Sequence, residues 1–316
     1  MPKAAAKPAA KTAAKPAVKA EVKPKPVAVA PGKPATDQYL LLESGQIRLR
    51  QTRQGPLAYI KSDMYIGRCL ELYGEFSPGE GRFFSQILKP GMWALDVGAN
   101  IGVHSVLFGQ KVGPTGRVIS FEPQRIINQL LSTNVALNGL FNVQTKQVAV
   151  SSAPGKLIVP QVNYFSESNF GALGFGGQKW EVGEEVPVIT LDSLNLPACH
   201  FIKIDVEGME TEVLKGATET LKKHRPILYV ENDRIEKSHE LITLLWGAGY
   251  RLYWHMTPYF YADNFYGSTE NPFPGIASFN MVCVPKEYSL VISGAREVKS
   301  AHEDWEVILG KKPLPA

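Results

Sequence analysis

The stretch "ALDVGANIGVHS", residues 94–105, combines an apolar strand, a glycine-containing turn and the start of a helix. In a doubly wound α/β sheet, the first such turn is where a nucleotide ligand approaches the backbone. Gly98 and Gly102 remove side chains from the path of the ligand, and Asn100 between them tolerates a left-handed backbone. The dinucleotide fingerprint G-x-G-x-x-G would need glycine at Asn100 and Val103, so a nicotinamide cofactor is disfavoured.

Two acids end the first two strands around this turn. Asp96 directly precedes the turn, and Glu122 closes the second strand in "RVISFEP". A carboxylate at the second position can accept hydrogen bonds from both ribose hydroxyls. Acids at the first turn repel a pyrophosphate but attract a cationic ligand. A nucleoside with a positive centre and no phosphate is S-adenosylmethionine, which we therefore expect as the cofactor; the alternative is that both acids serve only the strand ends.

Short apolar runs alternate with helical patterns after residue 91, which predicts right-handed crossovers and a parallel sheet covered on both faces. The segments "YRLYWHM" (250–256) and "NMVCVP" (280–285) leave no room for a crossover helix between them, so we expect an antiparallel pair at the sheet edge. The expected strands are Trp93–Val97, Arg117–Phe121, Val143–Val150, Phe201–Val206 and Ile227–Glu231, and the expected helices lie near 101–111, 124–137, 208–223 and 236–247.

Three acids follow the fourth of these strands in "FIKIDVEGMETEVLKGA" (201–217). Asp205 and Glu207 lie on the same side of an extended chain, since side chains alternate along a strand. We predict that they face the transferred methyl group, one as a base and the other as a hydrogen-bond acceptor for a substrate hydroxyl or as part of a metal site. Glu210 lies in the first turn of the next helix, where the helix dipole favours an acid, so a structural role is expected.

Six segments in this order resemble the FkbM family of methyltransferases, over roughly residues 62–285. They are "LKPGMWALDVGANIGVHS", "GPTGRVISFEP", "LSTNVALNGLFNVQTKQVAVSS", "ITLDSL", "FIKIDVEGMETEVLKGA" and "RPILYVEN". The resemblance implies a Rossmann-like class I methyltransferase fold, with a seven-stranded, mostly parallel sheet and an antiparallel edge strand. It also implies O-methylation of hydroxyls on sugars and natural products.

The resemblance further implies a set of cofactor-binding residues. The segment "YGEFSPGE" (73–80) resembles the family's pre-core segment, and its residues Tyr73 to Glu75 are expected to close over the cofactor. Carried over to this sequence, the cofactor-binding residues are Tyr73, Gly74, Glu75, Asp96, Gly98, Asn100, Gly102, Glu122, Ala149 and Val150.

Histidines and aromatic loops supply the remaining candidates. His255 leads into an aromatic loop (257–278) and is our third catalytic candidate, whereas His104 is expected to pack. That loop and the segment 163–177 carry many Phe, Tyr, Asn and Ser residues, a composition that suits a carbohydrate or polyketide acceptor. No metal ligand is assigned. A divalent metal held by Asp205, Glu207 and the next strand end, Glu231-Asn232, is an open alternative, because hard cations need several oxygen ligands.

Charge is distributed unevenly along the 316 residues. Eight lysines and one acid give residues 1–35 a net charge of +7, whereas 26 basic and 29 acidic residues give the remainder −3. The tail, with Lys-Pro at 7–8, 15–16 and 23–24, has few residues to bury and is expected to be disordered. A solubilising extension is favoured for it over a tether to an anionic partner. The acidic body disfavours an RNA methyltransferase.

The expected organisation is a basic tail (1–35), an N-terminal addition packing on the core (36–90), a methyltransferase domain (91–288) and a C-terminal extension (289–316). No apolar run approaches the roughly 20 residues of a membrane span. Three separated cysteines indicate a reducing compartment, and we expect a cytoplasmic protein. The predicted function is methyl transfer to a hydroxyl of a small-molecule or glycan acceptor. The alternative from another class is a binding protein that keeps the nucleotide pocket without transferring a methyl group.

Overall fold

The computed structural model describes residues 36–173, 180–292 and 294–312. The predicted basic tail, residues 1–35, lies outside the described residues, as does the part of the predicted substrate loop at 174–177. Among the described residues, no helix has both the length and the apolar character that crossing a bilayer requires.

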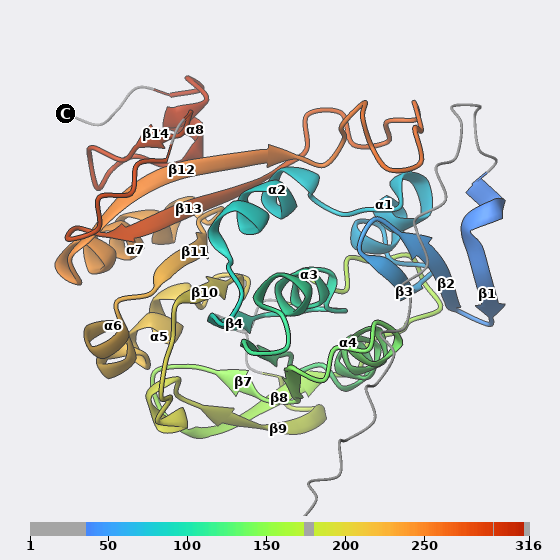
Figure 1. The fold of residues 1–316 in the computed structure, drawn as a ribbon, viewed down its shortest axis with the longest axis horizontal. Coiled ribbons are helices and arrows are strands. Elements are labelled where there is room, and N and C mark those ends of the chain that lie inside the picture. Colours follow the sequence, from blue (N-terminus) through green and yellow to red (C-terminus); the bar gives the residue numbers. More distant parts are fainter. Residues whose placement is uncertain (1–35, 174–179, 293, 313–316) are drawn as a thin grey trace, which may run out of the picture. The chain divides into compact units, whose positions relative to one another are not determined.

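An eight-stranded sheet forms the centre of the fold, with the order β14-β12-β13-β11-β10-β4-β5-β6 (Figure 1). The pairs from β11 to β6 are parallel, and β13 is antiparallel to both of its neighbours. The α/β fold with a mostly parallel sheet is therefore confirmed. The antiparallel strand β13 lies inside the edge, and the two-residue strand β14 extends the predicted seven strands to eight. The strands are β4 (Trp93–Val97), β5 (Arg117–Phe121), β6 (Val143–Lys146), β10 (Phe201–Ile204), β11 (Ile227–Glu231), β12 (Tyr250–Pro258), β13 (Ala277–Pro285) and β14 (Arg296–Glu297).

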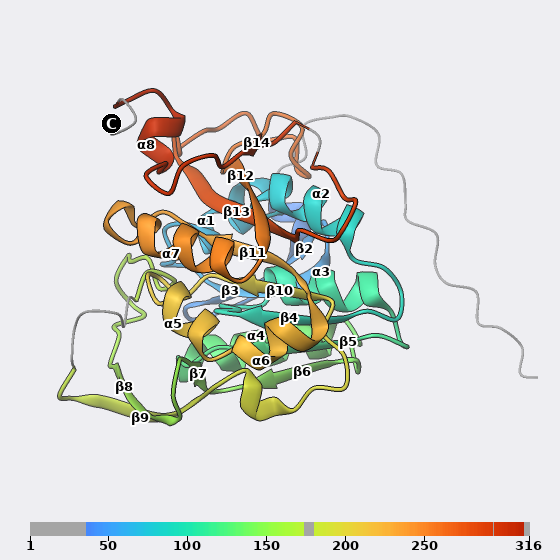
Figure 2. The same ribbon diagram turned by 90° about the vertical axis from the view of Figure 1, so that its left-hand side faces the viewer.

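Helices cover both faces of this sheet, because its central strands are apolar on both sides. Leu95 and Val97 of β4 face the cluster formed with α5, α6 and α7, whereas Ala94 faces the cluster formed with α2 and α3. Figure 2 shows α5, α6 and α7 together on one side of the sheet. The helices are α2 (Pro78–Ile87), α3 (Val103–Val112), α4 (Arg125–Leu137), α5 (Glu210–Lys215), α6 (Thr218–His224) and α7 (Ile235–Gly247).

Residues 36–90 add a three-stranded antiparallel sheet and two helices next to α3 and α4 (Figure 1). The fully buried Asn134 of α4 fixes this sheet, because its side-chain amide accepts from the Ala58 amide at 2.6 Å and donates to the Ala58 carbonyl at 3.0 Å. The elements are the 3₁₀ helix η1 (Thr36–Tyr39), β1 (Leu40–Ser44), β2 (Ile47–Thr52), β3 (Gly55–Ile60) and α1 (Ile66–Tyr73), followed by α2.

Two predicted elements are divided in the structure. The strand expected at Val143–Val150 separates into β6 and β7, because the chain leaves the large sheet and pairs in parallel with β9. The helix expected at 208–223 breaks at Gly216, where a Cβ atom would lie 2.1 Å from the Ser151 carbonyl oxygen. The remaining elements are β7 (Ala149–Val150), β8 (Gly155–Pro160), β9 (Gly183–Ile189), the 3₁₀ helix η2 (Asp192–Leu194) and α8 (Trp305–Ile308).

Candidate active site

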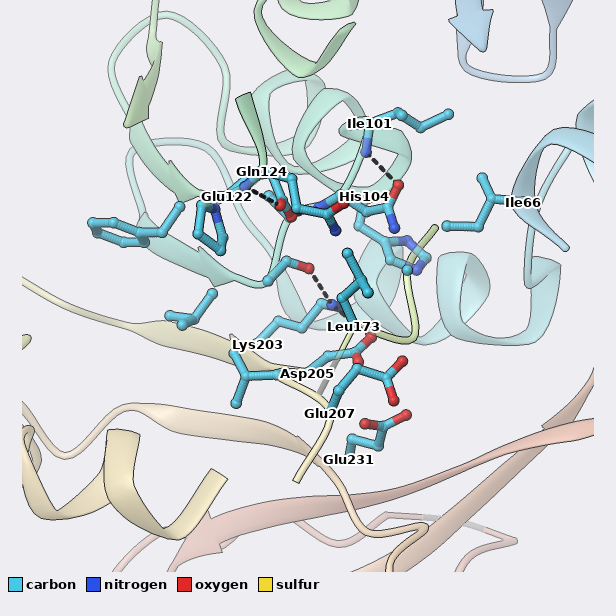
Figure 3. A pocket seen from close by; sticks show the side chains of 18 of the residues that line it. Ile66, Ile101, His104, Glu122, Gln124, Leu173, Lys203, Asp205, Glu207 and Glu231 are labelled. Carbon is cyan, nitrogen blue, oxygen red and sulfur yellow. Dashed lines mark hydrogen bonds and ion pairs between the residues drawn. The ribbon is translucent and has the colours of Figure 1, made fainter. Parts of the chain in front are cut away.

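A cavity opens at the carboxyl ends of β4, β5, β10 and β11, where ligands bind in open α/β sheets. Figure 3 shows Glu122 on one side of it and the carboxylates of Asp205, Glu207 and Glu231 on the opposite side. We call the part around the glycine turn and Glu122 the nucleoside half. The part around the three carboxylates is the carboxylate half, and Lys203 lies between the two (Figure 3).

The glycine turn brings the backbone of β4 against the end of β10. Gly98 has a φ of +77°, and a Cβ atom there would lie only 1.7 Å from the Asp205 carbonyl oxygen. Asn100 has a φ of +48°, and its side-chain oxygen accepts from the Ile101 amide at 2.7 Å. The left-handed residues expected in this turn are therefore present, and they serve close backbone packing as well as ligand access.

Glu122 ends β5 and projects into the nucleoside half (Figure 3). Its two carboxylate oxygens accept from the amides of Gln124 at 2.9 Å and Asn100 at 3.0 Å. Burial raises the pKa of Glu122 to about 7, although these backbone hydrogen bonds oppose the shift. Each oxygen keeps a second lone pair, so the side chain can still accept from the hydroxyls of a ligand.

A buried lysine connects the two halves of the cavity. Lys203, on β10, is 3% exposed, and its Nζ lies 3.0 Å from Asp205 Oδ2, 3.7 Å from Asp96 Oδ1 and 3.4 Å from the Gly98 carbonyl oxygen. Burial by itself lowers the pKa of Lys203, but the carboxylates of Asp205 and Asp96 outweigh it and raise that pKa above its usual value. The lysine therefore remains charged and holds Asp205 in place.

The carboxylate half gathers three acids from two strand ends. One oxygen from each of Asp205, Glu207 and Glu231 lies within 4.8 Å of the others, a spacing that a cation can bridge. Burial raises the pKa of Glu207 to about 8 and that of Glu231 well above its usual range, and the charge of Asp205 adds to both shifts. Arg234 pairs with Glu207, whereas the buried Oε2 of Glu231 has no hydrogen-bond partner among the described residues. This half is therefore suited to share a proton or a cation.

The carboxylate half also contains a strained backbone residue. Glu207 has a φ of +53°, a conformation that costs a non-glycine residue about 1–2 kcal/mol. Glu210 supports this turn, because its Oε1 accepts from the amides of Gly208 at 2.9 Å and Val206 at 3.2 Å. Its side chain therefore fixes the loop that carries Glu207, in line with the structural role expected for it.

The model of the methyltransferase FkbM domain matches residues 96–252, a segment that contains the glycine turn, Glu122, Lys203 and the three carboxylates. This chain belongs to the FkbM methyltransferase family. The methyltransferase sdnD of Sordaria araneosa is 31% identical in an alignment 159 residues long that covers 40% of this chain. The chain spans about 60% of the length of that relative.

Solved structures that resemble the FkbM chain include two methyltransferases. The precorrin-6y C5,15-methyltransferase of Geobacter metallireducens GS-15 is 13% identical with a TM-score of 0.43, covering 65% of this chain and 86% of that one. The methyltransferase FkbM of Methylobacillus flagellatus KT is 15% identical with a TM-score of 0.38, covering 64% of this chain and 50% of that one.

Seven of the residues predicted from the sequence line the cavity of this FkbM domain. They are Gly98, Asn100, Glu122, Ala149, Val150, Asp205 and Glu207. Asp96 and Gly102 do not line it. Asp96 is fully buried and accepts from the Ser105 hydroxyl at 2.6 Å, so it fixes α3 and Lys203. At Gly102 a Cβ atom would meet Leu131 at 2.5 Å, so this glycine allows α3 to pack on α4.

The predicted pre-core residues also lie outside the cavity lining. Tyr73 is buried and donates from its hydroxyl to the Glu270 carbonyl at 3.0 Å. Gly74 caps α1 with a φ of +66°, and Glu75 pairs with Arg53. These contacts tie the N-terminal segment to the loop after β12. The segment contributes to the cavity through Phe76 and Glu80 instead.

The third catalytic candidate, His255, is likewise outside the lining. Its Nδ1 lies 2.8 Å from the Tyr229 hydroxyl, and its ring packs on Phe83 at a centroid distance of 5.3 Å. Burial lowers the pKa of His255. These contacts assign it to the packing between β12, β11 and α2.

Several lining residues escaped sequence reasoning because they come from distant elements. The clearest local signal was Lys203, a charged residue within the apolar run "FIKID" and on the same side of the strand as Asp205. Tyr65, Ile66 and Asn280 gave no comparable signal. Phe76 and Glu80 belong to the pre-core segment, Tyr259 and Ser278 belong to the aromatic loop, and His104 was expected only to pack.

The nucleoside half fits S-adenosylmethionine by the chemistry of its side chains. Glu122 offers acceptors for ribose hydroxyls, and an apolar strip of Phe121, Val148, Ala149, Val150 and Leu157 suits a purine ring. Lys203 and His104 are the only basic side chains among the described lining residues, and Lys203 is already engaged by two aspartates. Such a lining favours a ligand without phosphates and with a positive centre.

Proposed function

We propose that this FkbM domain transfers a methyl group from S-adenosylmethionine to a hydroxyl oxygen of a polyhydroxylated small molecule or glycan. The observation that carries the proposal is the division of one cavity into a nucleoside half and a carboxylate half, joined by Lys203. When bound, S-adenosylmethionine supplies an electrophilic methyl group on a positively charged sulfur. The residues of the chain bind and orient the cofactor and the acceptor and exclude water from them.

In this proposal, Glu122 holds the ribose and the apolar strip around Val150 holds the adenine. Asp205, kept in place by Lys203 at 3.0 Å, accepts a hydrogen bond from the acceptor molecule. Positioning of the two reactants is the main contribution of such a site, worth about 7–11 kcal/mol when the geometry is good.

The acceptor side supports a polyhydroxylated ring as substrate. Glu207 and Glu231 bring oxygens that accept or donate hydrogen bonds according to their protonation, and Ser278 adds a hydroxyl. Phe76 and Tyr259, whose centroids are 5.3 Å apart, provide aromatic surface at the same end of the cavity. Together they suit a ring with hydroxyl edges and apolar faces.

Isothermal titration with S-adenosylmethionine and S-adenosylhomocysteine tests the nucleoside half. Methyl transfer is then measured by mass spectrometry on methyl hexosides, methyl 6-deoxyhexosides and a catechol, with magnesium chloride or EDTA present. Mass gain at a hydroxyl of one acceptor is the expected result. Cofactor binding without methyl transfer to any acceptor favours a binding protein. Transfer that occurs with magnesium chloride but not with EDTA indicates a required cation, for which the three carboxylates are the candidate ligands.

A further inference from the structure

A buried carboxylate–imidazole pair lines the cavity beside the carboxylate half. His104, the second residue of α3, is 8% exposed, and Glu80 of α2 is 4% exposed. His104 Nε2 lies 3.0 Å from Glu80 Oε2. Both residues line the cavity, and Figure 3 shows His104 next to Ile66. The pair has no part in the binding roles described above.

Glu80 is anchored from the opposite side of the cavity. Its Oε1 accepts from the Asn280 amide at 2.9 Å, and the Thr257 hydroxyl lies 3.4 Å away. Burial by itself raises the pKa of Glu80, but the contact with His104 and the positive charges of Lys203 and His255 outweigh it, so this pKa lies below its usual value. Glu80 is therefore a fixed anion beside the imidazole.

The ring of His104 is held by aromatic neighbours. Phe84 packs edge-on at a centroid distance of 5.1 Å, and Phe76 and Phe108 lie at 6.1 Å and 6.3 Å. Nε2 lies 3.0 Å from Glu80 Oε2 but forms no hydrogen bond of good geometry with a described residue, so aromatic packing and the charge of Glu80 hold the ring. Nδ1 has no hydrogen-bond partner among the described residues either, which leaves it for a ligand.

The three carboxylates are poor proton acceptors by comparison. Asp205 is neutralised by Lys203, and Glu207 is paired with Arg234. Burial keeps Glu207 and Glu231 mostly protonated near neutral pH, so only a minor ionised fraction of each could take a proton. The imidazole of His104 offers another acceptor in the same cavity.

We propose that His104 accepts the proton of the acceptor hydroxyl on Nδ1 and that Glu80 is a positioning residue that stabilises the resulting imidazolium. This inference rests on the proposed methyl transfer. The hydroxyl oxygen bonds to the methyl carbon while the carbon–sulfur bond breaks and its electron pair stays on sulfur. The hydroxyl proton moves to Nδ1, so the positive charge passes from sulfur to the imidazole.

Other titratable groups face this pair from the surrounding elements, and a pH profile has to be interpreted with them. Lys203 on β10 and His255 on β12 lie close enough to influence Glu80, and Tyr229 and Tyr259 respond to its charge. Lys203 is held by Asp96 and Asp205. Replacing Glu80 changes the charge next to His104 directly.

The first test needs no acceptor. In ¹⁵N-labelled full-length protein with S-adenosylhomocysteine, side-chain nitrogen NMR reports which nitrogen of neutral His104 carries hydrogen. We expect the hydrogen on Nε2, toward Glu80. A neutral imidazole with hydrogen on Nδ1 overturns the proposal, because that nitrogen could not accept a proton.

The second test uses whichever acceptor in the panel above is methylated. His104→Ala is expected to lower kcat by about 10²–10⁴-fold, with restoration by added imidazole and little change in S-adenosylmethionine affinity. His302→Ala, at an exposed histidine near the C-terminus, is the matched control. A variant that retains the wild-type kcat overturns the proposal. If that variant also binds S-adenosylmethionine much more weakly, His104 is assigned to cofactor binding.

Glu80→Gln tests whether Glu80 acts on the imidazole of His104 or only supports the structure. Loss of the neighbouring anion is expected to move the acid limb of the kcat/KM profile to lower pH by about one unit. An unmoved limb overturns the role of Glu80. If the wild-type chain binds S-adenosylmethionine but methylates no acceptor, the proposed function fails, while the NMR result still decides the state of His104.

Discussion

The two halves of the cavity are built in different ways. The nucleoside half comes largely from two short segments, 97–101 and 121–124, and its contacts are to backbone amides and carbonyls. The carboxylate half combines the ends of β10 and β11 with side chains from α1, α2 and the β12–β13 region. A site made from two short segments is specified locally, whereas a site assembled from five regions of the chain depends on the whole fold.

The halves also differ in how their charges are balanced. Glu122 is stabilised by two backbone amides, which are fixed dipoles of the turn. Asp205, Glu207 and Glu231 lie within 4.8 Å of one another and depend on the side chains of Lys203 and Arg234. The first half therefore owes its geometry to the fixed backbone, whereas the charge balance of the second half depends on side chains from several elements.

Gly98→Ala should have the largest effect, because it forces the turn of the nucleoside half away from β10. A Cβ atom at Gly98 would overlap the Asp205 carbonyl oxygen at 1.7 Å, at a φ of +77°. We expect the free energy of unfolding, measured in urea, to fall by more than about 5 kcal/mol. Gly139→Ala is the control, since its φ is +63° but no atom lies within 4 Å of the added Cβ. Its cost should be about 1–2 kcal/mol.

If Gly98→Ala and Gly139→Ala lowered the free energy of unfolding equally, the cost would come from backbone conformation alone and not from the contact between the turn and β10.

Lys203→Met should remove the link between the halves. The substitution leaves the buried Asp96 without its cation and frees Asp205, so the free energy of unfolding should fall by about 3–5 kcal/mol. Lys222→Met, at an exposed position on α6, should change it by less than about 0.5 kcal/mol. A Lys203→Met protein as stable as wild type would show that the two aspartates are not balanced by this lysine.

Glu207→Gln tests how charge is balanced in the carboxylate half. The pKa of Glu207 in the folded chain, about 8, lies above its ordinary value of 4.5. The folded chain therefore holds a proton that the unfolded chain releases, and the free energy of unfolding falls as pH rises from about 4.5 to 8. The Gln variant should lack this decline and be more stable than wild type by about 1–2 kcal/mol at pH 9.

Urea titrations at pH 5 and pH 9 measure the difference, with Glu219→Gln on the surface of α6 as the control. A parallel decline in the Gln variant would contradict repulsion among the three carboxylates. Magnesium chloride that stabilises wild type at pH 9, and not the Gln variant, would place a cation there.

Glu122→Gln gives the smallest expected effect and tests the nucleoside half alone. With a pKa of about 7, Glu122 goes from mostly protonated at pH 6 to mostly ionised at pH 8. Since a carboxylate accepts from ribose hydroxyls better than a carboxylic acid, the Kd for S-adenosylmethionine should tighten up to about tenfold over this range. Calorimetry on the Gln variant should give weak binding with no such pH dependence. Equal affinity in both proteins would remove Glu122 from the ribose site.

Sequence reasoning performed well where a motif is local. The strand, turn and acid at β4 and β5 follow from residue spacing, and Gly98, Asn100 and Glu122 do line the cavity. It was less informative where the position of a side chain depends on its neighbours across the fold. Asp96 was expected to contact the cofactor, but it lies outside the cavity lining, with Ser105 bonded to its Oδ2 and Lys203 3.7 Å from its Oδ1.

Tyr73 and His255 also have positions that a single sequence does not reveal. Their chemistry is suitable for a site, but Tyr73 is bonded to Glu270 and His255 to Tyr229, contacts between segments 197 and 26 residues apart. Conversely, His104 was expected only to pack and Glu80 was given no role of its own, yet the two meet because α2 packs on α3. A contact of that kind has no signature in a single sequence.

The sequence by itself determined the fold class and the position of the nucleoside half, because hydrophobic periodicity and a glycine turn act over a few residues. The family followed from the resemblance of six segments to the FkbM methyltransferases. Only the tertiary structure decided which of the many acids and histidines share one cavity. Burial and mutual repulsion then set their protonation, since pKa values depend on neighbours brought together by folding and not on residue type alone.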